Sequence, residues 1–240
     1  MAHINKNGRI SGAVGDLVFV NNGDRHYVRT RPEQVKQSMR TKAAAKVFGL
    51  VSTREKRLRW HLQHKLGIPP LQYLAARHRA RLQKTITGGA DSAVGAQARF
   101  GLPDALIGFD FNPKMEWHRF TNIFPVYEKT AMGGLTVRLP ELRWATHFKA
   151  PKKSTSAVMT LTAFSTDLNE ATVPVNIRST ITFEINRHTP IVEQVWSVPG
   201  GSVGEWLLIA GVVRFTGTDT TAANQVSAAY LWAYGSEGTS

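Results

Sequence analysis

The chain has 240 residues, 42% of them hydrophobic, and carries 30 Lys and Arg against 17 Asp and Glu, for a formal net charge of +13. This length and composition predict a folded protein of one large or two small domains with a proper hydrophobic core. The absence of cysteine excludes disulfide bonds, thiolate metal sites and a cysteine nucleophile.

The positive charge is concentrated in the first hundred residues. Residues 1–100 hold 19 Lys and Arg against 5 Asp and Glu, whereas residues 101–240 hold 11 against 12. Such asymmetry indicates an anionic partner: nucleic acid, an anionic membrane surface, or an acidic face of a neighbouring subunit. A solvated pair of basic helices that aids solubility is the alternative explanation.

The N-terminus has no features of a targeting segment. Residues 1–9 are polar, and no run of about 18 apolar residues occurs in the chain. We therefore expect neither a signal peptide nor a membrane-spanning helix, and a protein that is cytoplasmic when it is made.

The first thirty residues predict a β-hairpin punctuated by glycine. Residues 17–20 and 26–29 form its strands, and residues 21–24 supply the turn. A hairpin alone is marginally stable in water, so it must dock on its own chain or on a neighbour. Residues 30–40 are expected to be an extended tether. The candidate assembly residues are Leu17, Phe19, Tyr27 and Arg29.

Residues 41–86 are predicted to form two basic helices. Apolar residues recur at helical spacing over residues 47–66 and again over residues 71–82, where His78 falls in the apolar stripe. Gly67 is expected to end the first helix. The basic residues expected to contact an anion, or phosphates of nucleic acid without reading sequence, are Arg54, Arg57, Arg59, Arg77, Arg79, Arg81 and Lys84.

From Leu106 onward the sequence shows the alternation of β-strands. The predicted strands include residues 123–127, 135–139, 158–164, 173–177, 180–185 and 191–196. Residues 206–215 are apolar on both faces apart from Arg214, which predicts a central strand, and residues 226–234 close the series. Strands without helices between them favour an antiparallel β-sandwich, immunoglobulin- or fibronectin-like or jelly-roll-like.

These elements predict an α+β chain with two domains. Residues 1–104 would form a basic N-terminal arm of hairpin, tether and two helices, and residues 105–240 would form the antiparallel β-sandwich body. Residues 88–103 are expected to be a linker, because their glycines lack the lysine and serine of a phosphate-binding loop.

Several short motifs are spread along the chain. They are residues 12–20, 27–32, 40–41, 48–50, 109–112, 135–140 and 149–152. These motifs resemble a group of uncharacterised bacterial proteins with phage-associated relatives, over most of the chain. The resemblance implies a virion or tail component, and the group has no established activity. The chain departs from the commonest form at the helix start, where residues 38–39 and 42–43 replace Asn-Pro and the following Gln residues.

Few residues could carry enzyme chemistry. His61 and His64 share a helix face at a metal-compatible spacing, but without nearby acidic or thiolate ligands apart from Glu55 we predict no metal site. No nucleophile elbow, Walker or Rossmann fingerprint occurs, and we expect no cofactor and no small-molecule substrate. The residues that could be assembled into acid–base machinery are Glu116, His118 and Glu128.

Three functions follow from this sequence. The first is a non-enzymatic structural subunit that self-assembles into a homo-oligomeric, phage-related particle or filament, with its basic arm on neighbours or on nucleic acid. The second is a sequence-independent nucleic-acid-binding protein. The third is a hydrolase or nuclease that uses His118 with Glu116 or Glu128.

Overall fold

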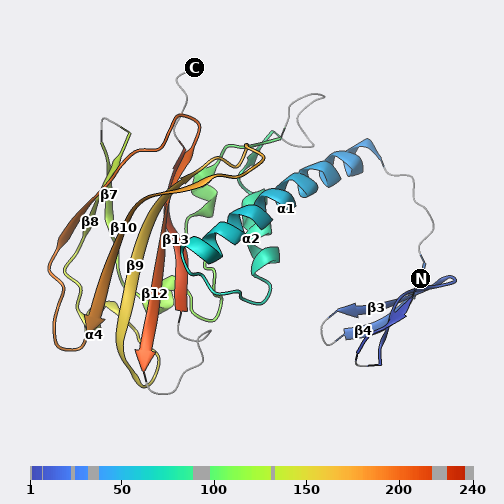
Figure 1. The fold of residues 1–240 in the computed structure, drawn as a ribbon, viewed down its shortest axis with the longest axis horizontal. Coiled ribbons are helices and arrows are strands. Elements are labelled where there is room, and N and C mark those ends of the chain that lie inside the picture. Colours follow the sequence, from blue (N-terminus) through green and yellow to red (C-terminus); the bar gives the residue numbers. More distant parts are fainter. Residues whose placement is uncertain are drawn as a thin grey trace. The chain divides into compact units, whose positions relative to one another are not determined.

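The computed structural model describes residues 2–6, 8–22, 25–31, 38–88, 98–130, 133–217 and 226–235. The chain forms two compact units, Met1–Lys42 and Ala43–Ser240. We call the first the N-terminal sheet unit and the second the body (Figure 1). The fold is α+β, as expected, and all of its described sheets are antiparallel.

The N-terminal sheet unit contains one four-stranded sheet of order β1-β2-β3-β4. Its strands are β1 (His3–Ile4), β2 (Ile10–Val14), β3 (Leu17–Asn22) and β4 (Arg25–Thr30). The predicted hairpin is confirmed as β3 and β4, although residues 23–24 of its turn lie outside the described residues. The strand β2 was not predicted, because Ser11, Gly12 and Ala13 give it almost no apolar alternation.

Two helices follow, α1 (Met39–Lys65) and α2 (Leu74–Gln83). The Ser38 hydroxyl accepts a hydrogen bond from the Thr41 N–H (3.1 Å), which caps the start of α1. Gly67 has a φ of +62° and follows the end of α1, as the sequence predicts. The buried residues of α1 recur at steps of three and four and are Val51, Glu55, Leu58 and Leu62.

The body is built around a central sheet of order β10-β9-β12-β13. Its strands are β9 (Ser154–Thr166), β10 (Val175–Asn186), β12 (Trp206–Gly217) and β13 (Val226–Gly235). The β12 strand is buried on both faces from Trp206 to Val213 and lies between β9 and β13. The prediction of a central strand at this position is therefore confirmed.

Smaller elements complete the body. A three-stranded sheet has the order β11-β8-β7, and β5 pairs with β6. Their bounds are β5 (Ile86–Thr87), β6 (Arg99–Phe100), β7 (Val126–Lys129), β8 (Leu135–Leu139) and β11 (Gln194–Val198). The short helices are the 3₁₀ turn η1 (Pro103–Leu106), α3 (Trp117–Phe120) and α4 (Trp144–His147).

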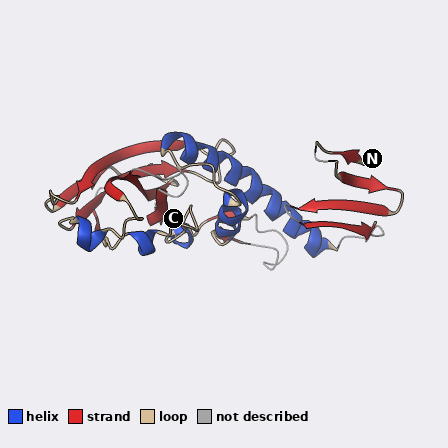
Figure 2. Cartoon of the chain, turned by 90° about the horizontal axis from the view of Figure 1, so that it is seen from below, coloured by secondary structure: helices blue, strands red, loops and turns tan. Residues whose placement is uncertain are grey.

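The central sheet has a hydrophobic core on each face. On one face, Leu208 and Tyr230 share a cluster with Leu58 and Leu82 of the two helices. On the other face, Ile209 shares a second cluster with side chains of β8 and β11. The body therefore has a layer of helices, the central sheet and the three-stranded sheet; Figures 1 and 2 show the helices beside the strands.

The boundary expected at residues 104 and 105 does not coincide with this division. The helices expected in the arm share a core with Phe164, Val175 and Tyr230, because their apolar stripes cover a face of the central sheet. Of the expected tether and linker, residues 32–37 and 89–97 lie outside the described residues. The unit that is separate from the body ends at Lys42.

Candidate nucleic-acid interface

Arg54, a predicted phosphate contact, is directed at the main chain of the body. Its Nε donates to Leu168 O (3.0 Å), its Nη1 to Ala171 O (3.1 Å) and its Nη2 to Asn169 O (3.3 Å). These carbonyls belong to the loop after β9, which ends at Thr166. A guanidinium supplies several donors in a fixed arrangement, which suits this loop. Arg54 therefore fastens α1 to the body.

Two arginines of α2 make contacts of the same kind. Arg77 donates through Nη2 to Asp110 O (2.7 Å) and through Nη1 to Phe111 O (3.2 Å). Arg81 donates through Nη2 to Ile107 O (2.6 Å). These bonds direct Nη1 and Nη2 of Arg77 and Nη2 of Arg81 at the segment before α3, and a phosphate would have to displace them.

The other four predicted basic residues have different surroundings. Arg59 Nε donates to the Glu55 carboxylate (2.8 Å), and the Arg79 guanidinium lies over the Phe48 ring at 4.8 Å. Arg57 and Lys84 are exposed. The seven residues predicted to contact an anion therefore include three internal anchors, an ion pair and a cation–π contact, and they do not form one uniform surface.

A buried polar network connects α1, α2 and β13. His78 Nδ1 lies 3.3 Å from Glu55 Oε1, and His78 Nε2 lies 3.1 Å from the Tyr230 hydroxyl. An ionised carboxylate has no proton to donate, so Glu55 accepts a hydrogen bond from Nδ1–H of His78. Tyr230 then donates its hydroxyl proton to Nε2. Burial lowers the pKa of His78, while burial and then the charge of Glu55 raise the pKa of Tyr230 well above its usual value.

This network has the order carboxylate, imidazole, hydroxyl that activates a nucleophile in hydrolases. Glu55 is 2% exposed, and His78 and Tyr230 are fully buried, so no substrate reaches the hydroxyl. The network is a tie between the helices and the central sheet. His78 was predicted on the apolar stripe of α2, but its contact with Tyr230 was not predicted, because the two residues are 152 positions apart in sequence.

Of the residues proposed for acid–base chemistry, Glu128 has an ion-pair partner, and Glu116 and His118 lie near a carboxylate. Glu128 lies 3.5 Å from Arg138 on the neighbouring strand. Glu116 and His118 lie at the start of α3, near Asp110, whose carboxylate accepts a hydrogen bond from the first N–H of α3 (2.6 Å). Burial raises the pKa of Asp110, and the hydrogen bond opposes this rise. The geometry is that of a capped helix start.

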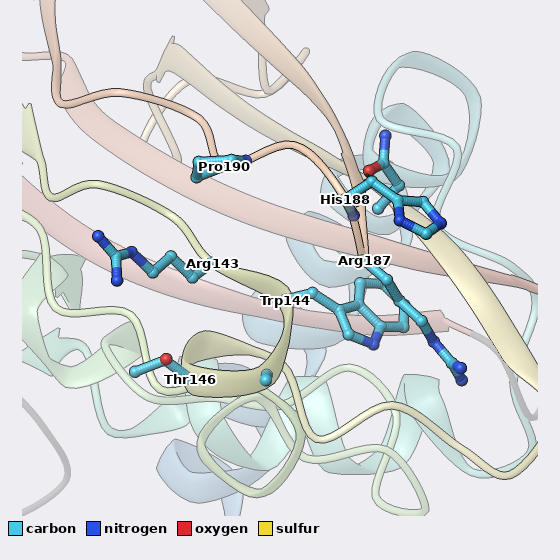
Figure 3. Close-up of a pocket in the computed structure, with 8 residues that line it drawn as sticks. Arg143, Trp144, Thr146, Arg187, His188 and Pro190 are labelled. Atoms are coloured by element: carbon cyan, nitrogen blue, oxygen red, sulfur yellow. Dashed lines mark hydrogen bonds between the residues drawn. The ribbon is translucent and has the colours of Figure 1, made fainter.

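A pocket of about 430 Å³ lies between the segment around α4 and the turn after β10 (Figure 3). Arg143 donates to both carboxylate oxygens of Glu141 (2.9 and 3.1 Å), and Arg187 donates to Ser154 O (3.2 Å). In Figure 3 the two guanidinium groups extend away from each other on either side of Trp144. The lining residues are Arg143, Trp144, Ala145, Thr146, Asn186, Arg187, His188 and Pro190, without a carboxylate.

The predicted assembly residues lie on opposite faces of the N-terminal sheet. Phe19 pairs with Val28 and Leu17 with Thr30, whereas Tyr27 and Arg29 pair with the alternate residues of β3. Directly paired residues share a face of an antiparallel sheet. Leu17 and Phe19 are therefore on one face, and Tyr27 and Arg29 are on the other.

The two faces of this sheet differ in charge. The first, which we call the apolar face, carries Ile4, Ile10, Val14, Leu17, Phe19 and Val28. Its other described residues, Gly12, Asn21, His26 and Thr30, include no Asp, Glu, Lys or Arg. The second face carries Arg25 and Arg29 beside Val18, Val20 and Tyr27. No described side chain of the N-terminal sheet is buried, and Ile4 and Val14 are 71% and 55% exposed.

The described residues contain neither a candidate metal-binding cluster nor a candidate membrane-spanning helix. Within them, no cluster of three or more His, Asp and Glu could hold a metal ion. None of the described helices combines the length and the apolar character needed to cross a bilayer.

No protein-family model, curated protein or solved structure matches the chain.

Proposed function

We propose that the protein is a non-enzymatic structural subunit that self-assembles through the apolar face of its N-terminal sheet. The observation that carries the proposal is a four-stranded sheet with six large apolar side chains on one face and no buried side chain among its described residues. A single β-layer is stable only when another layer covers its apolar face. The N-terminal sheet therefore needs a partner.

A second copy of the same sheet fits this requirement. Two sheets packed face to face at a spacing of about 10 Å form the smallest β-architecture that encloses a core. The apolar face has no charged residue among those described, so two copies meet without repulsion, and Arg25 and Arg29 stay on the outer faces. A two-fold axis makes such a contact self-complementary.

The body supplies the second part of the proposal. We propose that its two larger sheets form an antiparallel sandwich, immunoglobulin- or fibronectin-like or jelly-roll-like, that carries the helical layer. The shared cluster between β8, β11 and the central sheet supports this architecture. We propose that the assembly is a phage-related particle or filament, as the motif resemblance implies, and that the protein is made in the cytoplasm.

The test is the molar mass of the full chain, measured by size-exclusion chromatography with light scattering. We expect an oligomer for the natural protein and a shift to monomer for the double variant Leu17→Asp and Val28→Asp, which places charge on the apolar face. The control, Tyr27→Asp, places the same charge on the opposite face and should keep the oligomer. A monomeric natural protein at high concentration would overturn the proposal.

A second measurement does not depend on destabilising the sheet. Because the chain has no cysteine, Phe19→Cys and Tyr27→Cys each introduce one thiol, on the apolar face and on the opposite face. A short bis-maleimide should link two copies through the thiol at position 19 and not through the thiol at position 27. Equal cross-linking at both positions would contradict packing through the apolar face.

A further inference from the structure

The side of α1 that points away from the body is basic and exposed. The buried stripe of α1 contains Val51, Leu58 and Leu62, and residues on the opposite side of a helix are displaced from this stripe by half a turn. We call this opposite side the outer face of α1. Its members within the body, all exposed, are Lys46, Gly49, Thr53, Lys56, Arg57, Trp60 and His64.

The outer face has no negative charge to balance its cations. Glu55 is the only acidic residue in the α1 sequence, and it is buried with His78 on the opposite side. Lys46, Lys56 and Arg57 therefore contribute positive charge along a stretch from residue 46 to residue 57, about 17 Å at 1.5 Å per residue. Such a stripe matches the repeated charge of a phosphate backbone.

Trp60 adds a second kind of recognition. Its side chain is 53% exposed, although a tryptophan normally buries most of its area. The ring stacks on His64 with a centroid distance of 4.3 Å and an interplanar angle of 28°. His64 is itself held by a contact of 2.7 Å between its Nδ1 and Trp60 O. An exposed indole held in this way is a platform on which an unpaired base can stack.

We propose that the outer face of α1 binds single-stranded nucleic acid, with the three cations on phosphates and a base stacked on Trp60. Duplex DNA would offer phosphates to the cations but no free base to the Trp60 indole, because its paired bases stack on each other. A membrane is disfavoured, because a helix that lies in a bilayer interface needs an aliphatic and aromatic face, and this face has one aromatic residue and no aliphatic one. Arg54, Arg77 and Arg81 take no part, since their donors hold carbonyls of the body.

The first arm of the test measures charge. The anisotropy of fluorescein-labelled oligothymidylate and oligouridylate is titrated with the full chain at several salt concentrations. In the triple variant Lys46→Gln, Lys56→Gln and Arg57→Gln, the slope of log affinity against log salt should fall by about 2, since each phosphate contact on a single strand contributes about 0.7. The matched control, Lys114→Gln, Lys149→Gln and Lys152→Gln, removes the same charge from exposed positions elsewhere and should keep the slope.

The second arm measures stacking. Trp60→Ala should weaken binding to both oligonucleotides about tenfold and leave the salt slope unchanged, because it removes a stacked base and no charge. All the substituted residues are exposed, and circular dichroism checks that the variants fold. Three results would each overturn the proposal: equal loss of slope in the control, unchanged affinity in Trp60→Ala, or binding to phosphatidylserine vesicles without binding to either oligonucleotide.

Discussion

The N-terminal sheet and the central sheet of the body share an antiparallel architecture but differ in what covers them. The central sheet has helices on one face and the three-stranded sheet on the other, and its β12 strand is buried from Trp206 to Val213. The N-terminal sheet has an apolar face without charged residues among those described, and none of its described side chains is buried. The difference shows that alternation predicts a strand, whereas stability depends on the layers around it.

Basic residues also behave differently on the two sides of α1. Arg54 donates to three carbonyls of the body, whereas Arg57, three residues later, is exposed on the outer face. Both were predicted to contact an anion. The direction of a side chain around the helix axis decides whether its charge fastens the fold or remains available to a partner.

The largest expected effect tests the difference in burial. Leu58→Ala removes a side chain that is fully buried between α1 and the central sheet, and should lower the free energy of unfolding of the body by about 3 kcal/mol. Leu17→Ala on the N-terminal sheet should change the same transition by less than about 0.5 kcal/mol. Urea unfolding followed by tryptophan fluorescence measures both, because all six tryptophans lie in the body. Equal shifts would show that the two units unfold together.

A smaller effect tests the buried network. Tyr230→Phe leaves the buried Nε2 of His78 without its 3.1 Å hydrogen bond, and should lower the free energy of unfolding by about 1–2 kcal/mol. Tyr127→Phe is the control: it removes a hydroxyl from another tyrosine of the body, beside Trp232, and leaves no imidazole unpaired. If the two variants lose the same stability, the network does not hold the helices to the sheet.

The smallest expected effect is a dependence on pH. Burial lowers the pKa of His78; Glu55 opposes this shift and Arg59 adds to it. As the pH falls below about 6.5, the unfolded chain therefore takes up a proton at this histidine before the folded chain does. The stability from neutral His78 is therefore complete above that pH, and is lost as the pH falls towards the folded-state pKa. One proton contributes at most about 1.4 kcal/mol per pH unit.

The pH dependence is isolated by comparing two histidines. His78→Gln should reduce the slope of the free energy of unfolding against pH between neutral and mildly acidic conditions. His26→Gln replaces an exposed histidine of the N-terminal sheet and serves as the matched control, since the tryptophans report only the body. An unchanged slope in His78→Gln would show that His78 does not take up the proton.

Much of the fold could be predicted from short-range patterns. The hairpin of β3 and β4, the helices α1 and α2 and the end of α1 at Gly67 follow from alternation, helical spacing and glycine. The strand β2 could not be predicted, because it contains little apolar alternation and forms by pairing with β3. Its pairing partner, rather than its own sequence, determines its conformation.

The sequence by itself determined the hairpin of β3 and β4, the helices α1 and α2, the central position of β12 and the excess of positive charge in the first hundred residues, because local patterns and composition are enough for these. Only the tertiary structure decided that Arg54 and Arg77 anchor carbonyls, that Glu55 and His78 meet Tyr230, and that Arg214 on the apolar β12 donates to Gly67 O (2.7 Å). These contacts join residues that are distant in the chain. A buried polar group is stable only beside its partner, and the packing of helices on the sheet brings the partners together.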